Sequence, residues 1–230
     1  MFFNRKKNDR EIHLRQTYSQ CGEDSIIDFA FGQLKISHPV YMDIGAHHPF
    51  YLSNTALFYL RGCKGVSIEP DPSLYEVIRR ARPDETSLKV GLSDASGQIA
   101  DFYIMSASTL NTFSKSEAER YASYGNQSIR EIIKITLLTV NEVIEKYMGG
   151  ISPNFVSLDI EGMDLLIVKS FDFAKYRPEV LCIETLSYTE DNSEKKLTEI
   201  IAYVEKKGYF LYADTYINSI FVDKEKWKNR

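Results

Sequence analysis

Acidic residues recur in this sequence where apolar, strand-like segments end. The positions are Asp43, Glu69, Ser93–Asp94, Asp159–Glu161 and Glu184. In open α/β sheets ligands bind beyond the carboxyl ends of the strands, so we expect these residues to meet at one edge of a sheet. Carboxylates are costly to bury unless they are paired or bound to a ligand. Their repetition at strand ends therefore predicts a polar ligand site, which a purely structural core does not need.

The first two acids favour a ligand that carries a nucleoside. Gly45 and Ala46 leave room for a ligand to approach the backbone of the loop Asp43-Ile44-Gly45-Ala46-His47-His48-Pro49. Glu69 closes the next strand-like segment, where a carboxylate can accept hydrogen bonds from both hydroxyls of a ribose. The alternatives are a tight turn at Gly45 and a helix-capping role for Glu69.

Further polar residues are expected around the rest of this ligand. They are Ser93 and Asp94 beside its base, Gln20, Glu23 and Asp24 on a helix before the first strand, and Ser53, Asn54 and Thr55 at the start of the next helix. An acid on the first helix can meet an ammonium group, and the backbone amides that open the second can receive a carboxylate. The alternatives are a capped surface helix at Glu23 and a polar turn over 91–97.

The side chains at these strand ends that can move a proton or bind a metal ion are His47, His48, Asp159, Glu161 and Glu184. Histidine titrates near neutrality, so His48 is a candidate general base, as are Asp159 and Glu161. Oxygen ligands from Asp159, Glu161 and Glu184 can instead hold Mg²⁺. The alternatives are carboxylates that bond to loop amides and a histidine that only bonds to the backbone.

Strand-like and helix-like segments alternate from about Ser19 onward. Strands are expected at 39–44, 64–69, 86–92, 99–105, 135–138, 154–159 and 179–184, and a C-terminal hairpin at 209–213 and 217–222. Helices are expected at 51–60, 163–171 and 193–207. Three more are expected to begin at Asp71 with Pro72 at the first helical position, and at the capping boxes Ser114/Glu117 and Thr139/Glu142.

This order predicts an α/β fold with a Rossmann-like, doubly wound, seven-stranded sheet. The sheet should be mostly parallel, with one antiparallel strand from the C-terminal hairpin. A chain of 230 residues fits one domain, which we place at 19–230 after an N-terminal tail of residues 1–18.

The composition favours a protein of the cytoplasm that does not bind nucleic acid. Its 28 basic and 32 acidic residues give a net charge of −4, which offers no electrostatic reason for a phosphate-backbone partner. Cys21, Cys63 and Cys182 are far apart and suggest neither a disulfide framework nor a zinc motif. The sequence shows no signal peptide and no apolar stretch of membrane-spanning length.

The chain resembles the FkbM family of S-adenosylmethionine-dependent methyltransferases over about residues 16–223. Any one of the matching pieces is weak, but their order along the chain is specific. The pieces are Ser19-Gln20-Cys21-Gly22-Glu23-Asp24, the loop 43–49 with Ser53-Asn54-Thr55, Ile68-Glu69-Pro70, Gly91-Leu92-Ser93-Asp94, and Leu158-Asp159-Ile160-Glu161-Gly162 with Asp164.

The resemblance implies that S-adenosylmethionine is the methyl donor and that a hydroxyl of a sugar, glycan or secondary metabolite is the acceptor. Together with the residue patterns it predicts these donor-binding residues: Gln20, Glu23, Asp43, Gly45, Ala46, His47, Ser53, Asn54, Glu69, Pro70, Ser93 and Asp94. The positions of Asp159, Glu161 and Glu184 are similar to those where some sugar O-methyltransferases bind magnesium. That match is partial, because Thr185 and not a second acid follows Glu184.

Two other function classes remain open at this point. One is an NAD-dependent oxidoreductase, since Tyr203 and Lys207 have a spacing used in some dehydrogenases. These residues also simply share a face of the predicted helix, and the later glycines of a dinucleotide loop are missing. The other is a non-catalytic nucleoside-binding protein of the same fold.

Overall fold

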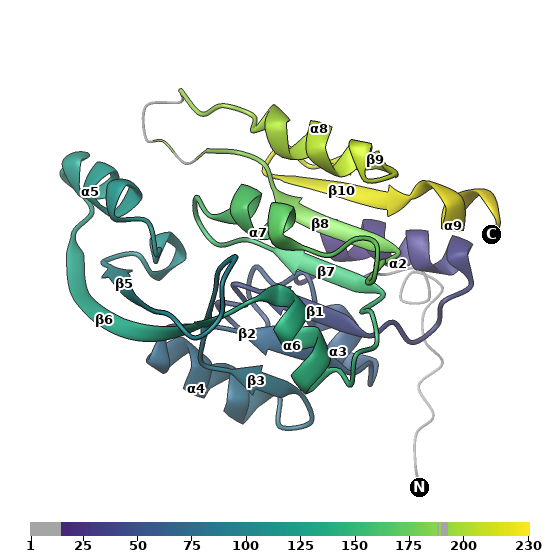
Figure 1. Ribbon diagram of the computed structural model, residues 1–230, viewed down its shortest axis with the longest axis horizontal. Coiled ribbons are helices and arrows are strands. Elements are labelled where there is room, and N and C mark those ends of the chain that lie inside the picture. The colour runs from purple at the N-terminus through teal and green to yellow at the C-terminus, as the bar shows by residue number, and fades with distance from the viewer. Residues whose placement is uncertain (1–14, 188, 190–192) are drawn as a thin grey trace, which may run out of the picture.

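Seven strands form the central sheet of the computed structural model, in the order β3-β2-β1-β7-β8-β10-β9 (Figure 1). The structure describes residues 15–187, 189 and 193–230. The strands are β1 (Tyr41–Ile44), β2 (Gly65–Ile68), β3 (Thr86–Leu88), β7 (Phe155–Leu158), β8 (Val180–Glu184), β9 (Tyr209–Asp214) and β10 (Asn218–Asp223). β1, β2, β3, β7 and β8 pair in parallel, and β10 is antiparallel to β8 and β9. The predicted fold class is confirmed.

Helices cover both faces of this sheet because its buried strands are apolar on both sides. Met42 and Ile44 of β1 belong to a core shared with α6 (Val140–Tyr147), α7 (Asp164–Ser170) and α8 (Thr198–Lys206). Tyr41, the residue before Met42, points to the other face and packs with α2 (Glu23–Leu34) and α3 (Ala56–Leu60). Two further helices are α4 (Pro72–Ala81) and the short α9 (Lys224–Lys228).

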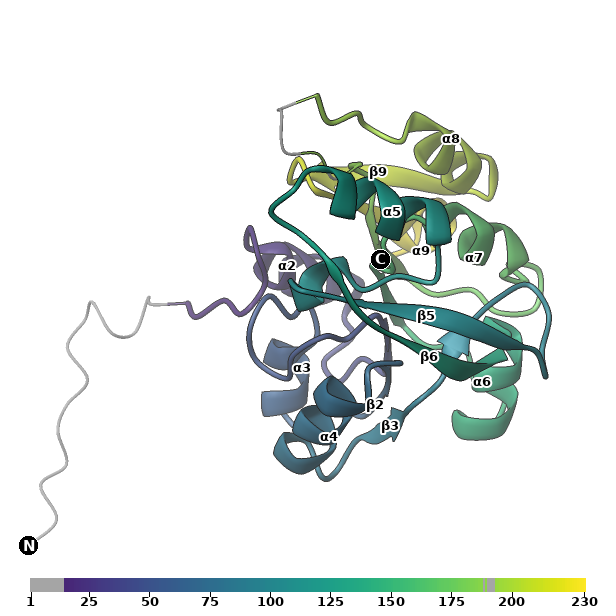
Figure 2. The same cartoon turned by 90° about the vertical axis from the view of Figure 1, so that its left-hand side faces the viewer.

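A second, three-stranded sheet extends from the main one. It has the order β4-β6-β5 and consists of β4 (Gly91–Leu92), β5 (Ile99–Met105) and β6 (Ile129–Leu138). Between β5 and β6 the chain forms the 3₁₀ turn η1 (Ser108–Leu110) and helix α5 (Lys115–Ser123). We call residues 99–138 the arm; Figure 2 shows it in front of the central sheet. The arm has a small core of its own, which includes Met105, Leu110 and Tyr121.

The predicted starts of three helices are confirmed by their caps. Asp71 accepts hydrogen bonds from the backbone N–H groups of Ser73 and Leu74, and Pro72 is the first residue of α4. Ser114 and Thr139 each accept the backbone N–H three residues later. Each cap satisfies donors that would otherwise have no partner at a helix end.

Several predicted element boundaries are wrong. The helix expected at 51–60 is only α3, because Leu52 has a left-handed backbone (φ 54°) that interrupts it. The strand expected at 86–92 divides, since β3 pairs with β2 while β4 pairs with β6. β6 is longer than 135–138 because it pairs with β5 along its length. The helix expected at 193–207 begins only at Thr198, since Lys196 pairs with Leu186.

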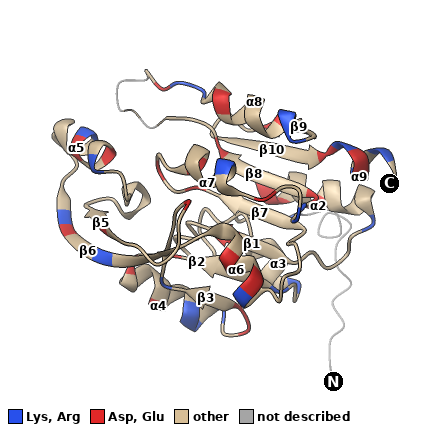
Figure 3. Ribbon diagram, viewed as in Figure 1, with Lys and Arg blue, Asp and Glu red and all other residues tan. Residues whose placement is uncertain are grey.

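Charged residues of both signs lie close together on the outer elements. Figure 3 shows Lys and Arg beside Asp and Glu on α5 and along β6. Lys115 and Glu119 form an ion pair on α5, and Lys134 of β6 pairs with Asp101 of β5. Within the described part of the chain, none of the helices has the length and apolar character needed to cross a bilayer.

Candidate active site

A cavity of about 360 Å³ lies at the carboxyl ends of the central strands. Gly45 follows β1, Glu69 follows β2, Asp159 and Glu161 follow β7, and Glu184 ends β8; all five line the cavity. β1 has β2 on one side and β7 on the other, so the chain crosses the sheet in opposite directions from this strand. Such a switch point opens a crevice at the strand ends, where ligands bind in doubly wound sheets.

Gly45 allows the ends of β1 and β7 to approach each other closely. Its φ is 81°, and a Cβ atom at this position would lie 1.8 Å from the backbone oxygen of Asp159. The same loop places two non-glycine residues in the left-handed region, His47 (φ 51°) and Leu52 (φ 54°). Both line the cavity, so the unusual backbone of this loop is concentrated at the site.

Glu69 is held in one orientation at the cavity wall. One carboxylate oxygen accepts the backbone N–H of His47 at 2.9 Å, and the other accepts that of Asp71 at 2.8 Å. Burial raises the pKa of Glu69 to about 7, although both hydrogen bonds favour the charged form. Each carboxylate oxygen of Glu69 can still accept one more hydrogen bond, so the fixed carboxylate offers two acceptor atoms to a ligand in the cavity.

Three carboxylates gather on the opposite part of the wall. Asp159, Glu161 and Glu184 each offer an oxygen atom within 4.8 Å of the others. Burial, followed by the charge of Asp164, raises the pKa of Asp159 to about 7. Burial and the charge of Asp159 raise the pKa values of Glu161 and Glu184. These groups resist ionising together unless a proton or a cation offsets their charge.

The arm closes the cavity through polar contacts with the strand-end loops. The Tyr121 hydroxyl donates to the Glu161 carboxylate at 2.9 Å, and the Thr112 hydroxyl donates to the Glu161 carbonyl at 2.8 Å. Asn111 donates to Asp71 at 3.0 Å. The arm also lines the cavity with Phe102, Ser108, Thr109, Leu110, Asn111 and Phe113. One side of the site is therefore built by the arm and the other by the central sheet.

A profile of the methyltransferase FkbM domain matches residues 43–211. The chain belongs to the FkbM methyltransferase family. This family depends on S-adenosylmethionine, and the matched residues include the five strand-end positions that line the cavity. No curated protein sequence matches the chain.

Solved structures similar to this FkbM chain are distant in sequence. A putative caffeoyl-CoA O-methyltransferase from Staphylococcus aureus has 8% identity, with 93% of this chain and 88% of that chain covered and a TM-score of 0.48. A putative O-methyltransferase from Klebsiella pneumoniae has 7% identity, coverage of 93% and 86%, and a TM-score of 0.45. A precorrin-6y C5,15-methyltransferase from Geobacter metallireducens has 14% identity, coverage of 85% and 86%, and a TM-score of 0.42.

Half of the predicted site residues of this FkbM methyltransferase come together in the cavity. They are Gln20, Gly45, His47, Glu69, Pro70, Asp159, Glu161 and Glu184. The other predicted residues lie outside its lining: Glu23, Asp43, Ala46, His48, Ser53, Asn54, Ser93 and Asp94. Their assignment as donor-binding or catalytic groups stays a prediction.

Several residues outside the lining have partners within the protein. Glu23 accepts hydrogen bonds from Thr215 at 2.6 Å and Asn218 at 3.0 Å. Burial opposes the ionisation of Glu23, but these bonds and the Cys21 backbone N–H hold its pKa below the ordinary value. His48 is a turn acceptor, because its Nδ1 receives the backbone N–H groups of Phe50 and Tyr51.

The polar residues in and after β1, and those after β4, are similarly engaged. Asp43 accepts the Thr55 hydroxyl at 2.5 Å, and burial raises the pKa of Asp43 to about 6. Asn54 donates to Ser157 at 3.1 Å, and the Ser93 hydroxyl donates to Asp94 at 3.1 Å. The residues around Asp43 therefore support the loop after β1 without lining the cavity.

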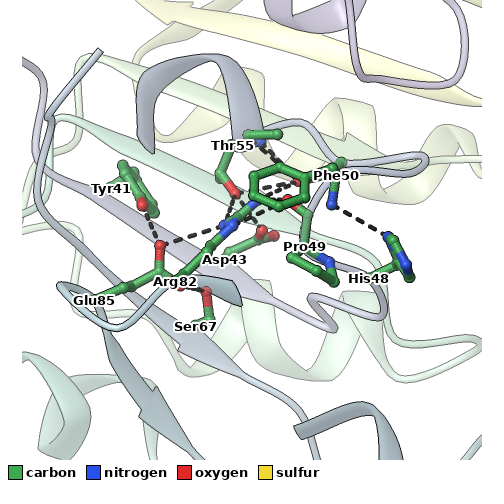
Figure 4. Close-up of polar contacts among 11 residues, drawn as sticks. Tyr41, Asp43, His48, Pro49, Phe50, Thr55, Ser67, Arg82 and Glu85 are labelled. Atoms are coloured by element: carbon green, nitrogen blue, oxygen red, sulfur yellow. Dashed lines mark hydrogen bonds and ion pairs between the residues drawn. The ribbon is translucent and has the colours of Figure 1, made fainter. Parts of the chain in front are cut away.

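Arg82 and Glu85 form a buried ion pair beneath this loop, and the sequence analysis did not find them (Figure 4). Their side chains are 1% and 0% exposed. An arginine just after a helix, followed by Pro83, has the pattern of an exposed basic residue near a helix C-terminus, so the sequence carries no signal of its burial.

Tyr203 and Lys207 are not among the residues that line the cavity. The Lys207 ammonium lies 5.1 Å from the centre of the Tyr203 ring, and the Tyr203 hydroxyl donates to the Lys169 carbonyl. This agrees with the interpretation that the two residues share a helix face.

Proposed function

We propose that this FkbM methyltransferase moves the methyl group of S-adenosylmethionine to a hydroxyl oxygen of a sugar, glycan or secondary metabolite. The observation that supports this most is the cavity itself. It combines the fixed carboxylate of Glu69 with the cluster formed by Asp159, Glu161 and Glu184. The first suits the ribose of the donor, and the second suits an acceptor hydroxyl.

On the donor side, Glu69 accepts hydrogen bonds from the two ribose hydroxyls. Gln20, Gly45, His47 and Pro70 form the rest of the donor wall, since they line the cavity with Glu69. Gly45 brings the backbone close to the ligand because it has no side chain. Asp43, Ala46, Ser53 and Asn54 support this wall from behind, and Glu23, Ser93 and Asp94 complete the proposed donor set at its ends.

On the acceptor side, the hydroxyl oxygen forms a bond to the methyl carbon while the carbon–sulfur bond breaks. The electron pair of the carbon–sulfur bond stays on sulfur, which loses its positive charge. The hydroxyl proton passes to Asp159 or Glu161. Alignment of the reacting atoms can lower the barrier by about 7–11 kcal/mol, and a positioned base adds about 10²–10⁴-fold. We do not assign the base to His48, because its Nδ1 is occupied by two backbone N–H groups.

The carboxylate cluster also fits Mg²⁺. Carboxylate oxygens are the ligands that this hard cation prefers, and three of them lie within 4.8 Å of one another. Among the described residues, no ion pair joins Asp159, Glu161 or Glu184 to a lysine or arginine, so no basic side chain in that part of the chain is paired with them. When bound, Mg²⁺ would lower the pKa of the acceptor hydroxyl.

The acceptor that this wall favours is uncharged and rich in hydroxyl groups. In the part of the cavity lining that the structure describes, carboxylates occur without any lysine or arginine. Such a wall repels phosphates and carboxylates. Ser108, Thr109 and Asn111 of the arm supply hydrogen-bonding groups, and Phe102 and Phe113 supply apolar faces. We therefore propose a small molecule or glycan, and not a nucleic acid, as the acceptor.

Calorimetry tests the donor assignment. S-adenosylhomocysteine should bind the wild-type protein, and NAD should not. Glu69→Ala should weaken binding by about 100-fold, as expected for loss of a charged hydrogen-bond acceptor for two hydroxyls. Glu205→Ala, which removes an exposed acid of α8, serves as the matched control and should bind normally. Unchanged affinity in Glu69→Ala would remove the ribose assignment.

Mass spectrometry tests the reaction. The protein is incubated with S-adenosylmethionine and panels of neutral glycosides, acidic sugars and RNA oligonucleotides. A gain of one methyl group on an oxygen of a neutral acceptor is the expected result. Donor binding without transfer to any acceptor would favour the non-catalytic alternative. Binding of NAD in place of the sulfonium compound would favour the oxidoreductase.

A further inference from the structure

Arg82 uses every N–H group of its guanidinium inside the protein. Its Nε and one Nη group donate to the Pro49 carbonyl, and that Nη also donates to the Ser53 hydroxyl at 2.9 Å. The other Nη group donates to the Thr55 hydroxyl at 3.0 Å and to Glu85 at 3.3 Å. A guanidinium has five N–H donors, so this arginine has none left for a ligand.

Three of these partners belong to the β1–α3 loop, residues 45–55. Pro49 precedes Leu52, and Ser53 and Thr55 follow it; Leu52 has a left-handed backbone and lines the cavity. A non-glycine residue in that region costs roughly 1–3 kcal/mol, so it persists only where surrounding contacts hold it. Arg82 supplies such contacts on each side of the strained residue.

We call Arg82 together with Pro49, Ser53, Thr55 and Glu85 the Arg82 clamp. This clamp is also hydrogen-bonded to strands β1 and β2, which carry part of the site. Thr55 donates to Asp43 of β1, while Glu85 accepts hydrogen bonds from Tyr41 of β1 and Ser67 of β2 (Figure 4). The rings of Phe50 and Tyr59 lie 5.8 and 5.3 Å from the guanidinium carbon. The loop is therefore tied to the sheet edge through one buried cation, which does not itself line the cavity.

We propose that Arg82 is a positioning residue for the methyl donor, which holds the β1–α3 loop in its ligand-ready conformation. This inference rests on the proposed function, since it assigns the loop to donor binding. Gly45, His47 and Leu52 reach the donor directly, and Arg82 acts through them. Lysine cannot replace it, because an ammonium has three donors and no planar fork for the loop carbonyl and both hydroxyls.

The test compares Arg82→Met and the charge-retaining Arg82→Lys with Arg177→Met. Arg177 also pairs with a buried acid, Asp223, and donates to the Lys207 carbonyl, but it lies before β8, at the opposite end of that strand from Glu184. Amide hydrogen exchange of residues 45–55 and calorimetry with S-adenosylhomocysteine are measured on all four proteins. If Arg82→Met does not fold, hydrogen exchange and calorimetry of Arg82→Lys test the inference instead.

Faster exchange in the loop and an affinity lower by at least about 10-fold are expected for both Arg82 variants, as when a competent conformation falls to a tenth of the population. Arg177→Met should change neither quantity, even at an equal loss of thermal stability. Unchanged exchange in the Arg82 variants, or faster exchange with wild-type affinity, overturns the inference. If the wild-type protein binds no S-adenosylhomocysteine, the donor assignment fails and the positioning role of Arg82 fails with it. Amide hydrogen exchange of residues 45–55 still shows, independently of donor binding, whether Arg82 holds the loop.

Discussion

The hydroxyl of Tyr121 on α5 donates a hydrogen bond to the carboxylate of Glu161 over 2.9 Å. Glu161 follows β7, has a left-handed backbone (φ 51°) and also receives the Thr112 hydroxyl at its carbonyl. The arm thus holds the acid that the central sheet presents. The acceptor side of the site depends on this contact between the arm and the loop after β7, because the arm and the central sheet orient Glu161 only together.

Replacement of Tyr121 by phenylalanine should lower kcat without altering donor affinity. The variant keeps the ring in the arm core but removes the hydrogen bond to Glu161. A hydrogen bond to a charged group is worth about 1.5–3 kcal/mol, so kcat should fall by about 10- to 100-fold. Tyr124→Phe, at the residue that follows α5, is the control for steady-state kinetics. An equal loss in both variants would contradict the role of Tyr121.

Glu69 should make the ligand-free protein less stable as the pH rises. Its pKa is raised by burial from 4.5 to about 7 in the folded chain, so the folded state holds the proton more tightly than the unfolded state. This contribution is complete below about pH 4.5 and is lost as the pH passes 7, with a size of roughly 3 kcal/mol. Asp43, Asp159 and Asp164 act in the same direction, because burial raises their pKa values as well.

Urea unfolding between pH 5 and 8 measures this effect. Glu69→Gln should show a shallower fall in the free energy of unfolding than the wild-type protein, because glutamine does not titrate. The same slope in both proteins would show that Glu69 does not hold its proton in the folded state.

Magnesium should stabilise the folded protein through the carboxylate cluster. At about 100 times its dissociation constant, a ligand of the folded state adds roughly 3 kcal/mol. Thermal unfolding with Mg²⁺ and with a chelator should therefore give different midpoints in the wild-type protein. Glu184→Gln should abolish the difference, and Glu199→Gln, at an exposed acid of α8, should preserve it. Equal midpoints in the wild-type protein would exclude the metal assignment.

A methyl group at Gly45 should disrupt the site far more than one at Gly97. Both glycines have positive φ values, 81° and 78°, so alanine strains the backbone at either position. Only at Gly45 does the added Cβ meet the Asp159 backbone, at 1.8 Å, while at Gly97 nothing lies within 4 Å. Gly97→Ala should cost about 1–2 kcal/mol in urea unfolding and leave donor binding intact.

Gly45→Ala should lower the free energy of unfolding by more than Gly97→Ala does. It should also weaken the binding of S-adenosylhomocysteine, because the ends of β1 and β7 must separate to make room for the added Cβ. Equal costs in the two variants would show that backbone conformation, and not close approach, determines the effect at Gly45.

The sequence by itself determined the fold class, the helix starts with capping residues and the acids that line the cavity. These features follow from local sequence patterns. The periodicity of apolar residues and short apolar runs predict strands, and capping residues predict helix starts. The carboxyl ends of parallel strands then lie at one edge of the sheet. Glu69, Asp159, Glu161 and Glu184 were predicted for that reason. The loop 43–49 also carried the family resemblance, which the FkbM profile over residues 43–211 confirms.

Tertiary structure alone decided which polar residues face the cavity and which lie behind it. Asp43 and His48 belong to the same motif as Gly45, yet one bonds to Thr55 and the other to its own turn. The arm contacts and the Arg82–Glu85 pair join segments that are far apart in sequence, so no local pattern encodes them. A side chain's partners depend on how the elements pack, and packing is a property of the whole chain.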